Sequence, residues 1–258
     1  MTVQLSGALV TSRPVVVHPD PSEAGHRALR WAAAEADRRS SVLQLAPARG
    51  SAHDALRKLS ADAAVVVVPA TLTDVTAVVA SSYCPVVVAP AEPPSPGADA
   101  GPVALAAAPW TGEDVIDAAF EEAWRPVGAL HCSWSEPGIS LGRLQPGPIA
   151  DWDRPQERAR RELELAISPW RIVHPGVDVR CIAVQDDAAE LLLARSHRAP
   201  LLVLGRSTRG ALLAGLSESP VTALLRTAHC PVLIVPPEGP PRTTWLPDRA
   251  SRWASSLR

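Results

Sequence analysis

Residues 203–219, VLGRSTRGALLAGLSES, combine the features from which phosphate-binding loops are built. An apolar run leads into a loop with glycines and hydroxyl side chains, and a segment with helical character follows. Glycines let backbone N–H groups approach phosphate oxygens, and the positive end of the following helix adds to the attraction. The candidate ligands here are Gly205, Arg206, Ser207, Arg209, Gly210 and Ser219. The competing interpretation is a plain surface loop, with Ser217 or Ser219 capping the next helix.

A second candidate position is Asp20, which ends the apolar run in VVVHPDPS. This carboxylate could contact a ligand, or it could cap the helix that begins near Ser22, because short acidic side chains accept hydrogen bonds from helical N–H groups. His18 has no nucleophile or second acid near it in the sequence, so we expect a histidine at the solvent rim rather than a general base. The motifs GxSxG, HExxH and GxxxxGK[ST] do not occur in the sequence. We therefore expect no enzymatic activity.

The elements that position these candidates recur along the chain. The stretches YCPVVVAP (83–90) and HCPVLIVP (229–236) are near copies, and each follows a helix-like segment. Further upstream of each copy lies another apolar run, AAVVVVP (63–69) or PLLVLG (200–205). Such self-similarity indicates an internal repeat of alternating strands and helices.

The composition of AEPPSPGADAGP (91–102) is typical of a linker. The sequence thus predicts a truncated domain at 1–92, a linker at 93–101, a full domain at 102–238 and a tail at 239–258. Uninterrupted apolar strands that alternate with helices predict an α/β fold with two doubly wound parallel sheets. In the second half we predict strands at 103–107, 127–134, 177–184, 201–205 and 231–235, with helices at 112–124, 153–167, 187–196 and 219–227. The first half is short by about one helix and one strand of this unit.

Composition indicates which partners and which cell compartment the protein is suited to. The net charge is -2 and 20% of the residues are charged, so nothing favours nucleic acid. No apolar run reaches the roughly 18 residues that a membrane span needs, and the start of the sequence does not resemble a signal peptide. Cys84, Cys132, Cys181 and Cys230 are widely spaced without a CxxC pair, which indicates reduced core thiols rather than a zinc site. We expect a cytoplasmic protein without a metal site.

A first strand, a VLG-loop-helix segment and a closing CPVLIVP together resemble a tandem universal stress protein of the actinobacterial type. The resemblance covers roughly residues 13–90 and 102–237, and it is strongest in PLLVLGRSTRGALLAGLSESPVTALLRTAHCPVLIVP (200–236). It implies Rossmann-like domains, with strand order 3-2-1-4-5 in the second. It also implies that strands 85–89 and 231–235 pair, either within the chain as a pseudo-dimer or with a second chain as a homodimer, because an open apolar edge would invite aggregation.

Members of this family that bind ATP hold the phosphates on a loop written Gly, two residues, Gly, nine residues, Gly, then Ser or Thr. Gly205 and Ser219 match this pattern, but Thr208 and Glu218 take the places of the second and third glycines. A carboxylate about 4 Å from a phosphate charge would repel it by roughly 4 kcal/mol at an effective dielectric constant near 20. The family pattern therefore indicates a phosphate loop that has lost its function.

ATP-binding members also carry an aspartate after the first strand that contacts the adenosine part. Asp20 matches it in the first half, where the phosphate loop is too short, whereas the second half has Ala108 in that place. We therefore expect a non-catalytic module of the stress response with a regulatory or interaction role, degenerate nucleotide sites, no bound cofactor and an unidentified protein partner. The alternative is a stress sensor that binds ATP or another nucleotide on loop 205–219.

The tail PRTTWLPDRASRWASSLR places Leu246, Trp253 and Leu257 along one side of a helix. Its arginines lie elsewhere on that helix, so the pattern is amphipathic. We expect a docking helix, which binds either within the chain or to a partner, rather than a membrane helix.

Overall fold

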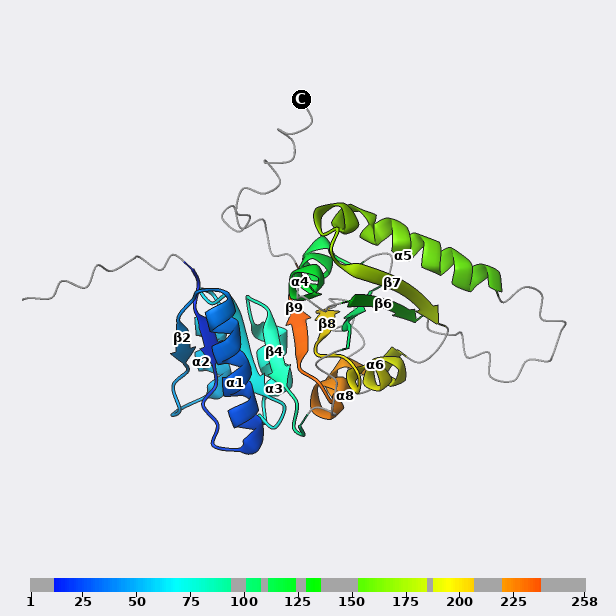
Figure 1. Cartoon of the computed structure of the whole chain (residues 1–258). Coiled ribbons are helices and arrows are strands. Elements are labelled where there is room, and N and C mark those ends of the chain that lie inside the picture. The colour runs from blue at the N-terminus through cyan, green and yellow to red at the C-terminus, as the bar shows by residue number, and fades with distance from the viewer. Residues whose placement is uncertain are drawn as a thin grey trace, which may run out of the picture.

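Strands and helices alternate along the chain (Figure 1). The structure, a computed structural model, describes residues 12–93, 101–107, 111–123, 129–135, 153–184, 188–206 and 220–237. The first half contains β1 (Val15–Val17), α1 (Glu23–Arg38), β2 (Leu43–Leu45), α2 (Ala52–Leu59), β3 (Val65–Pro69), α3 (Val75–Ser81) and β4 (Val86–Ala89). The second half contains β5 (Val103–Ala106), α4 (Glu113–Ala123), β6 (Ala129–Ser135), α5 (Asp153–Val173), β7 (Asp178–Val184), α6 (Ala188–Ser196), β8 (Leu202–Gly205), α8 (Pro220–Thr227) and β9 (Val232–Val235).

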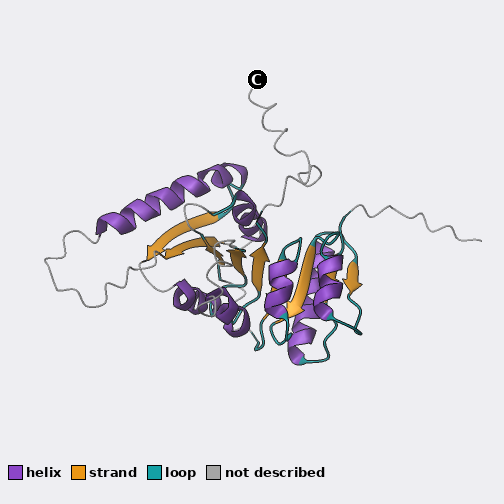
Figure 2. Ribbon diagram, turned by 180° about the vertical axis from the view of Figure 1, so that it is seen from behind, coloured by secondary structure: helices purple, strands orange, loops and turns teal. Residues whose placement is uncertain are grey.

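The described strands form one sheet in the order β2-β1-β3-β4-β9-β8-β5-β6-β7. Neighbouring strands are parallel except β4 and β9, which pair antiparallel with Val87 opposite Leu233. Read from β7, the second half contributes its third, second, first, fourth and fifth strands. Figure 2 shows the strands as a layer with helices on both sides. The two halves therefore meet at the β4–β9 pair.

Valine-rich runs form these strands because both faces of the sheet are covered by helices. Successive side chains of a strand point to opposite faces, so Val15 and Val17 enter one core while Val16 enters the other. One core lies under α1, α4 and α5, and the other lies under α2, α3, α6 and α8. Each core contains residues from both halves of the chain. Hydrophobic burial thus holds the halves together as well as folding each one.

The first half ends its side of the sheet at β2, as expected for a unit that is one strand short. In the second half β6 pairs with β7 from Ala129 opposite Asp178 to Ser135 opposite Val184. Among the described residues β2 pairs only with β1, and Leu45 in it is 58% exposed. The first half therefore presents a short edge strand where the second half has a further strand.

Helix α5 is longer than the predicted span 153–167, because it continues through Pro169 to Val173. Proline has no N–H group, so the carbonyl of Leu165 loses the hydrogen bond that a residue at 169 would normally donate. The hydroxyl of Ser168 donates to this carbonyl instead, at 2.9 Å. The helix can therefore pass the proline, which the sequence rule for helix ends does not anticipate.

Within the described residues, none of the helices combines the length and apolar character needed to cross a membrane.

Candidate functional site

The second half has its topological switch point between β5 and β8, where a sheet of this kind usually binds ligands. Gly205, the last residue of β8, lies at this point. A Cβ atom on Gly205 would lie 3.1 Å from Cγ2 of Val115 in α4, which is tighter than ordinary packing. Close packing of the helix on the strand therefore accounts for this glycine without any ligand.

Arg206 follows β8 and reaches into the first half of the molecule. Its Nη1 donates to the carbonyl oxygens of Val79 at 2.8 Å and Ser82 at 2.7 Å, at the C-terminal end of α3. Its backbone N–H donates to Val235 in β9 at 2.7 Å. The carbonyls at a helix C-terminus carry a partial negative charge and lack helical partners, so a guanidinium group stabilises them. Burial lowers the pKa of Arg206, but an arginine stays charged at neutral pH.

Arg206 thus has a structural contact that was not expected, and its role as a phosphate ligand stays a prediction. Its side chain fastens the base of the 205–219 loop to a helix of the other half, which the sequence did not indicate. The other candidates in the loop, Ser207, Arg209, Gly210 and Ser219, lie outside the described residues, and so do Thr208, Glu218 and Ala108.

Asp20 follows β1, which adjoins β3 at the corresponding switch point of the first half. Its Oδ1 accepts a hydrogen bond from the backbone N–H of Ser22 at 2.7 Å, and Ser22 Oγ in turn accepts one from Gly25 N at 3.1 Å. Ser22 is thus the N-cap of α1, and Asp20 shapes the turn before it. The interpretation that Asp20 itself caps the helix is wrong, because the cap lies two residues later. The hydrogen bonds from Ser22 lower the pKa of Asp20, with smaller contributions from His18 and His26.

This turn is tight enough to require glycine at position 25. A Cβ atom there would lie 2.1 Å from the backbone oxygen of Asp20, so any other residue would push the turn away from the helix. The backbone N–H of His18 donates to Val67 at 3.0 Å, which joins the turn to β3. Nδ1 of His18 is buried without a hydrogen-bond partner among the described residues, and burial lowers the pKa of this histidine. The imidazole is therefore neutral at pH 7.

The loop after β3 is short, as expected. Residues 70–74 separate β3 from α3, whereas residues 206–219 separate β8 from α8. A loop of five residues that begins with a hydrogen bond from Ala70 N to Ala89 O has little backbone left to wrap around a phosphate chain. The first half therefore presents an aspartate without a phosphate loop.

A buried cluster of charges joins α1 to α4, on the face of the sheet opposite to α3. Nη2 of Arg38 donates to Glu35 Oε1 and to Glu122 Oε1, both at 2.6 Å, and Arg39 also bonds Glu35. The two glutamates are each 3% exposed, so the nearby arginine charges are needed to stabilise their buried carboxylates. Burial raises the pKa of Glu35, but the hydrogen bonds and charges of Arg38 and Arg39 outweigh it and hold the pKa below the ordinary value.

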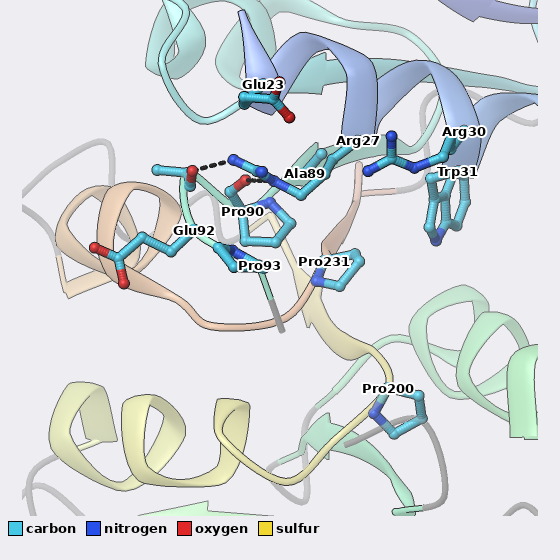
Figure 3. A pocket seen from close by; sticks show the side chains of 11 residues that line it. Glu23, Arg27, Arg30, Trp31, Ala89, Pro90, Glu92, Pro93, Pro200 and Pro231 are labelled. Atoms are coloured by element: carbon cyan, nitrogen blue, oxygen red, sulfur yellow. Dashed lines mark hydrogen bonds between the residues drawn. The ribbon is translucent and has the colours of Figure 1, made fainter. Parts of the chain in front are cut away.

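A hollow of about 890 Å³ lies at the junction of the halves (Figure 3). It is bounded by α1, the segment after β4 and the residues that precede β8 and β9. Arg27 crosses it and donates through Nε to Pro90 O at 3.1 Å and through Nη2 to Ala91 O. Arg27 thus fixes the path of the chain as it leaves β4, while Arg30 and Trp31 lie beside it. The residues that line the hollow are Glu23, Arg27, Arg30, Trp31, Ala89, Pro90, Ala91, Glu92, Pro93, Pro200 and Pro231.

The polar side chains described above mainly make contacts that stabilise the fold. In the part of the chain that the structure describes, no three His, Cys, Asp or Glu side chains come together in a way that could hold a metal ion. Arg206, Asp20 and Arg27 all direct their polar groups at backbone atoms of neighbouring segments. The contacts of Arg206 and of the Glu35 cluster were missed from the sequence. The one available signal was the motif E-A-x-R, which occurs at 35–38 and again at 122–125.

Sequence comparison with known proteins finds relatives that match the second half of the chain. Residues 111–236 match the model of the universal stress protein family. One universal stress protein of Mycobacterium tuberculosis is 31% identical over 119 residues, which are 45% of this chain and 38% of the relative. Another from the same organism is 30% identical over 159 residues, 59% of this chain and 49% of the relative. The matches thus span less than half the length of these relatives.

Solved structures extend the likeness in fold to both halves. A universal stress protein from Archaeoglobus fulgidus superposes with a TM-score of 0.53 at 11% identity, covering 87% of this chain and 96% of that one. A functionally unknown protein from Pseudomonas aeruginosa gives the same TM-score at 16% identity, covering 88% and 93%. At these identities the likeness shows the fold alone. Residues 111–236 of this chain are thus similar to the universal stress protein family.

Proposed function

We propose that the chain is a non-catalytic module of the stress response, with a regulatory or interaction role and with degenerate nucleotide sites. The observation that carries this proposal is that the described candidate ligands are committed to internal contacts. Arg206 caps α3, Asp20 holds the turn before α1, and Gly205 packs on Val115. The family relationship supports the stress-response part.

We further propose that the two halves are tandem copies that form a pseudo-dimer inside one chain. A matching pair of hydrogen-bonding serines supports this. Ser60 Oγ accepts from Tyr83 N at 3.0 Å, and Ser196 Oγ accepts from His229 N at 3.1 Å. Each hydroxyl also donates to the carbonyl three residues earlier, at 2.7 Å. Ser60 directly follows α2, the helix before β3, and Ser196 is the last residue of α6, the helix before β8. Each serine contacts the segment before the last strand of its half.

The charged cluster supports the same relationship. Glu35 in α1 and Glu122 in α4 are both buried, and both are bound by Arg38. The buried alanines Ala32 and Ala36 precede and follow Glu35 as Ala119 and Ala123 precede and follow Glu122. Equivalent surfaces of two related helices thus face each other, which is how symmetric dimers assemble. A cytoplasmic location fits Cys84, Cys181 and Cys230, whose sulfur atoms are thiols rather than disulfides in the described structure.

The test is calorimetric titration of the full chain with ATP, ADP and AMP, with and without magnesium. We expect no binding heat up to millimolar nucleotide. The matched control is the double variant Thr208→Gly and Glu218→Gly, which restores the glycines of the family pattern. Binding by the double variant alone would assign the loss of function to these two residues, whereas micromolar binding by the unaltered chain would overturn the proposal.

The alternative, a stress sensor that binds a nucleotide, is favoured by the position of Gly205 at the switch point of the second half. It predicts that the unaltered chain binds nucleotide and that Arg209→Ala weakens binding without changing thermal stability. A change at Arg206 would not distinguish the two proposals by nucleotide affinity alone. Because Arg206 caps α3, losing it could weaken binding by destabilising the fold.

A further inference from the structure

Helix α5 carries an apolar stripe on the side that faces away from the sheet. Ile172 is 82% exposed, Leu165 is 72% exposed and Val173 is 63% exposed, the highest values among the large hydrophobic side chains that the structure describes. Leu165, the exposed Pro169 and Ile172 follow the spacing i, i+4, i+7, so they share one face of the helix.

This stripe is distinct from the face of α5 that packs in the core. Ala159, Leu163 and Ile167 are buried, and Trp170 packs against the core beside α4. Residues 165 and 172 each lie two positions after a core-facing residue, on the opposite side of the helix. Scattered exposed hydrophobics are common, but a row of them along one helix face marks a contact surface. The core of the sheet does not explain the stripe.

The sequence contains a segment that matches the stripe in length and spacing. Beyond the described residues, the tail carries Leu246, Ala250, Trp253 and Leu257 at i, i+4, i+7 and i+11. Most other positions between 248 and 258 are polar or charged, and Pro247 is well suited to the first position of a helix. A helix from Pro247 to Leu257, with Leu246 directly before it, would be about 16 Å long, enough to cover the three residues of the stripe.

The described part of the chain ends near enough to α5 for this contact. Strand β9 ends at Val235 and packs against α4, which in turn packs against α5. His174, the first residue after α5, lies beside Phe120 of α4 with their ring centroids 5.5 Å apart. β9 ends beside Gly205, which packs on Val115 near the start of α4. The C-terminal end of α5 is thus about 10 Å across α4 and, from Val115 to Phe120, about 7.5 Å along it from the end of β9. Residues 238–245 can span up to about 26 Å when extended, so they can reach across.

We propose that residues 247–257 form an amphipathic helix that packs on Leu165, Pro169 and Ile172 of α5 in the same chain. The partner of this surface is thus a segment of the protein itself rather than a second copy or another protein. The contact covers the most exposed apolar residues of the described structure and ties the tail to the second half.

The test is hydrogen exchange of the full chain, read for peptides from residues 246–258. In the unaltered protein we expect amides there to exchange about tenfold more slowly than in an unfolded peptide, because helical hydrogen bonds protect them. Trp253→Asp and Ile172→Asp should each abolish this protection. Ser255→Asp places the same charge on the opposite side of the helix, and it should leave the protection intact.

Thermal unfolding gives a second, independent measurement. Each of Trp253→Asp and Ile172→Asp should lower the Tm by about 2–4 °C, and the double variant should lower it no further, because both remove one contact. Unprotected tail amides in the unaltered chain, or additive shifts in Tm, would refute the proposal. A dimer in light scattering that Ile172→Asp dissociates, and that survives removal of residues 238–258, would also refute it in favour of a second copy.

Discussion

Replacing Arg206 by alanine tests whether the base of the 205–219 loop serves stability or ligand binding. The change removes the group that donates to Val79 O and Ser82 O at the end of α3. Val79 and Ser82 are 6% and 1% exposed, so water reaches their carbonyls poorly once the guanidinium is gone. We therefore expect Arg206→Ala to destabilise the whole protein.

The expected loss follows from the two unpaired carbonyls. A buried polar group left without a partner costs about 1–3 kcal/mol, but Arg206 is only half-buried, and a water molecule can enter part of the space it leaves. We therefore expect the free energy of unfolding to fall by about 2 kcal/mol in total. For a chain of this length such a loss lowers the Tm by roughly 4–8 °C.

The assay is thermal and urea unfolding followed by circular dichroism, with nucleotide titration of the same samples. Arg226→Ala is the matched control, because it removes an exposed arginine from the last turn of α8. Since both halves share one sheet and two cores, we expect one cooperative transition in each variant. The Tm of Arg206→Lys should lie between those of Arg206→Ala and the unaltered protein, because an ammonium group cannot reproduce the fixed geometry of a guanidinium.

The reasoning is refuted if Arg206→Ala unfolds within about 1 °C of the unaltered protein, since this is less than the cost of one lost hydrogen bond. A variant with unchanged Tm and weakened nucleotide binding would show that Arg206 serves a ligand and that the contact with α3 contributes nothing to stability.

Other positions give further expectations. Glu122→Gln should destabilise by about 2 kcal/mol in urea unfolding, because it weakens one side of a buried charged cluster; no change would show that the cluster is neutral for stability. Since the pKa of Glu35 is held below its ordinary value, its stabilisation is full above about pH 4.3 and should decline as the pH falls through the lowered pKa; flat stability there would contradict this. Gly205→Ala should cost about 1 kcal/mol of unfolding free energy and be rescued by Val115→Ala, whereas additive losses would exclude overpacking. Gly25→Ala should cost more than about 3 kcal/mol or prevent folding, and a normal Tm would contradict the contact with the turn.

Local patterns in the sequence determined the elements and their order. Short β-branched runs such as Val65–Pro69 favour strands covered on both faces, and their alternation with helices indicates parallel pairing. The near copies at 83–90 and 229–236 indicated the repeat, and the family resemblance implied that their strands pair. The five residues after β3 were too few for a phosphate loop. These features depend on neighbours along the chain, which is why one sequence sufficed.

The tertiary structure alone decided which candidates have other roles. Nothing near Arg206 in the sequence indicates that its guanidinium caps α3, because the carbonyls it binds lie more than a hundred residues earlier. The same holds for Arg38, which joins Glu35 on its own helix to Glu122 on another. The attraction between two charges depends on their distance in space, and the pairing of β4 with β9 and the shared cores bring these segments together. A ligand motif and a structural contact can therefore use the same residue types, and the folded chain determines which one forms.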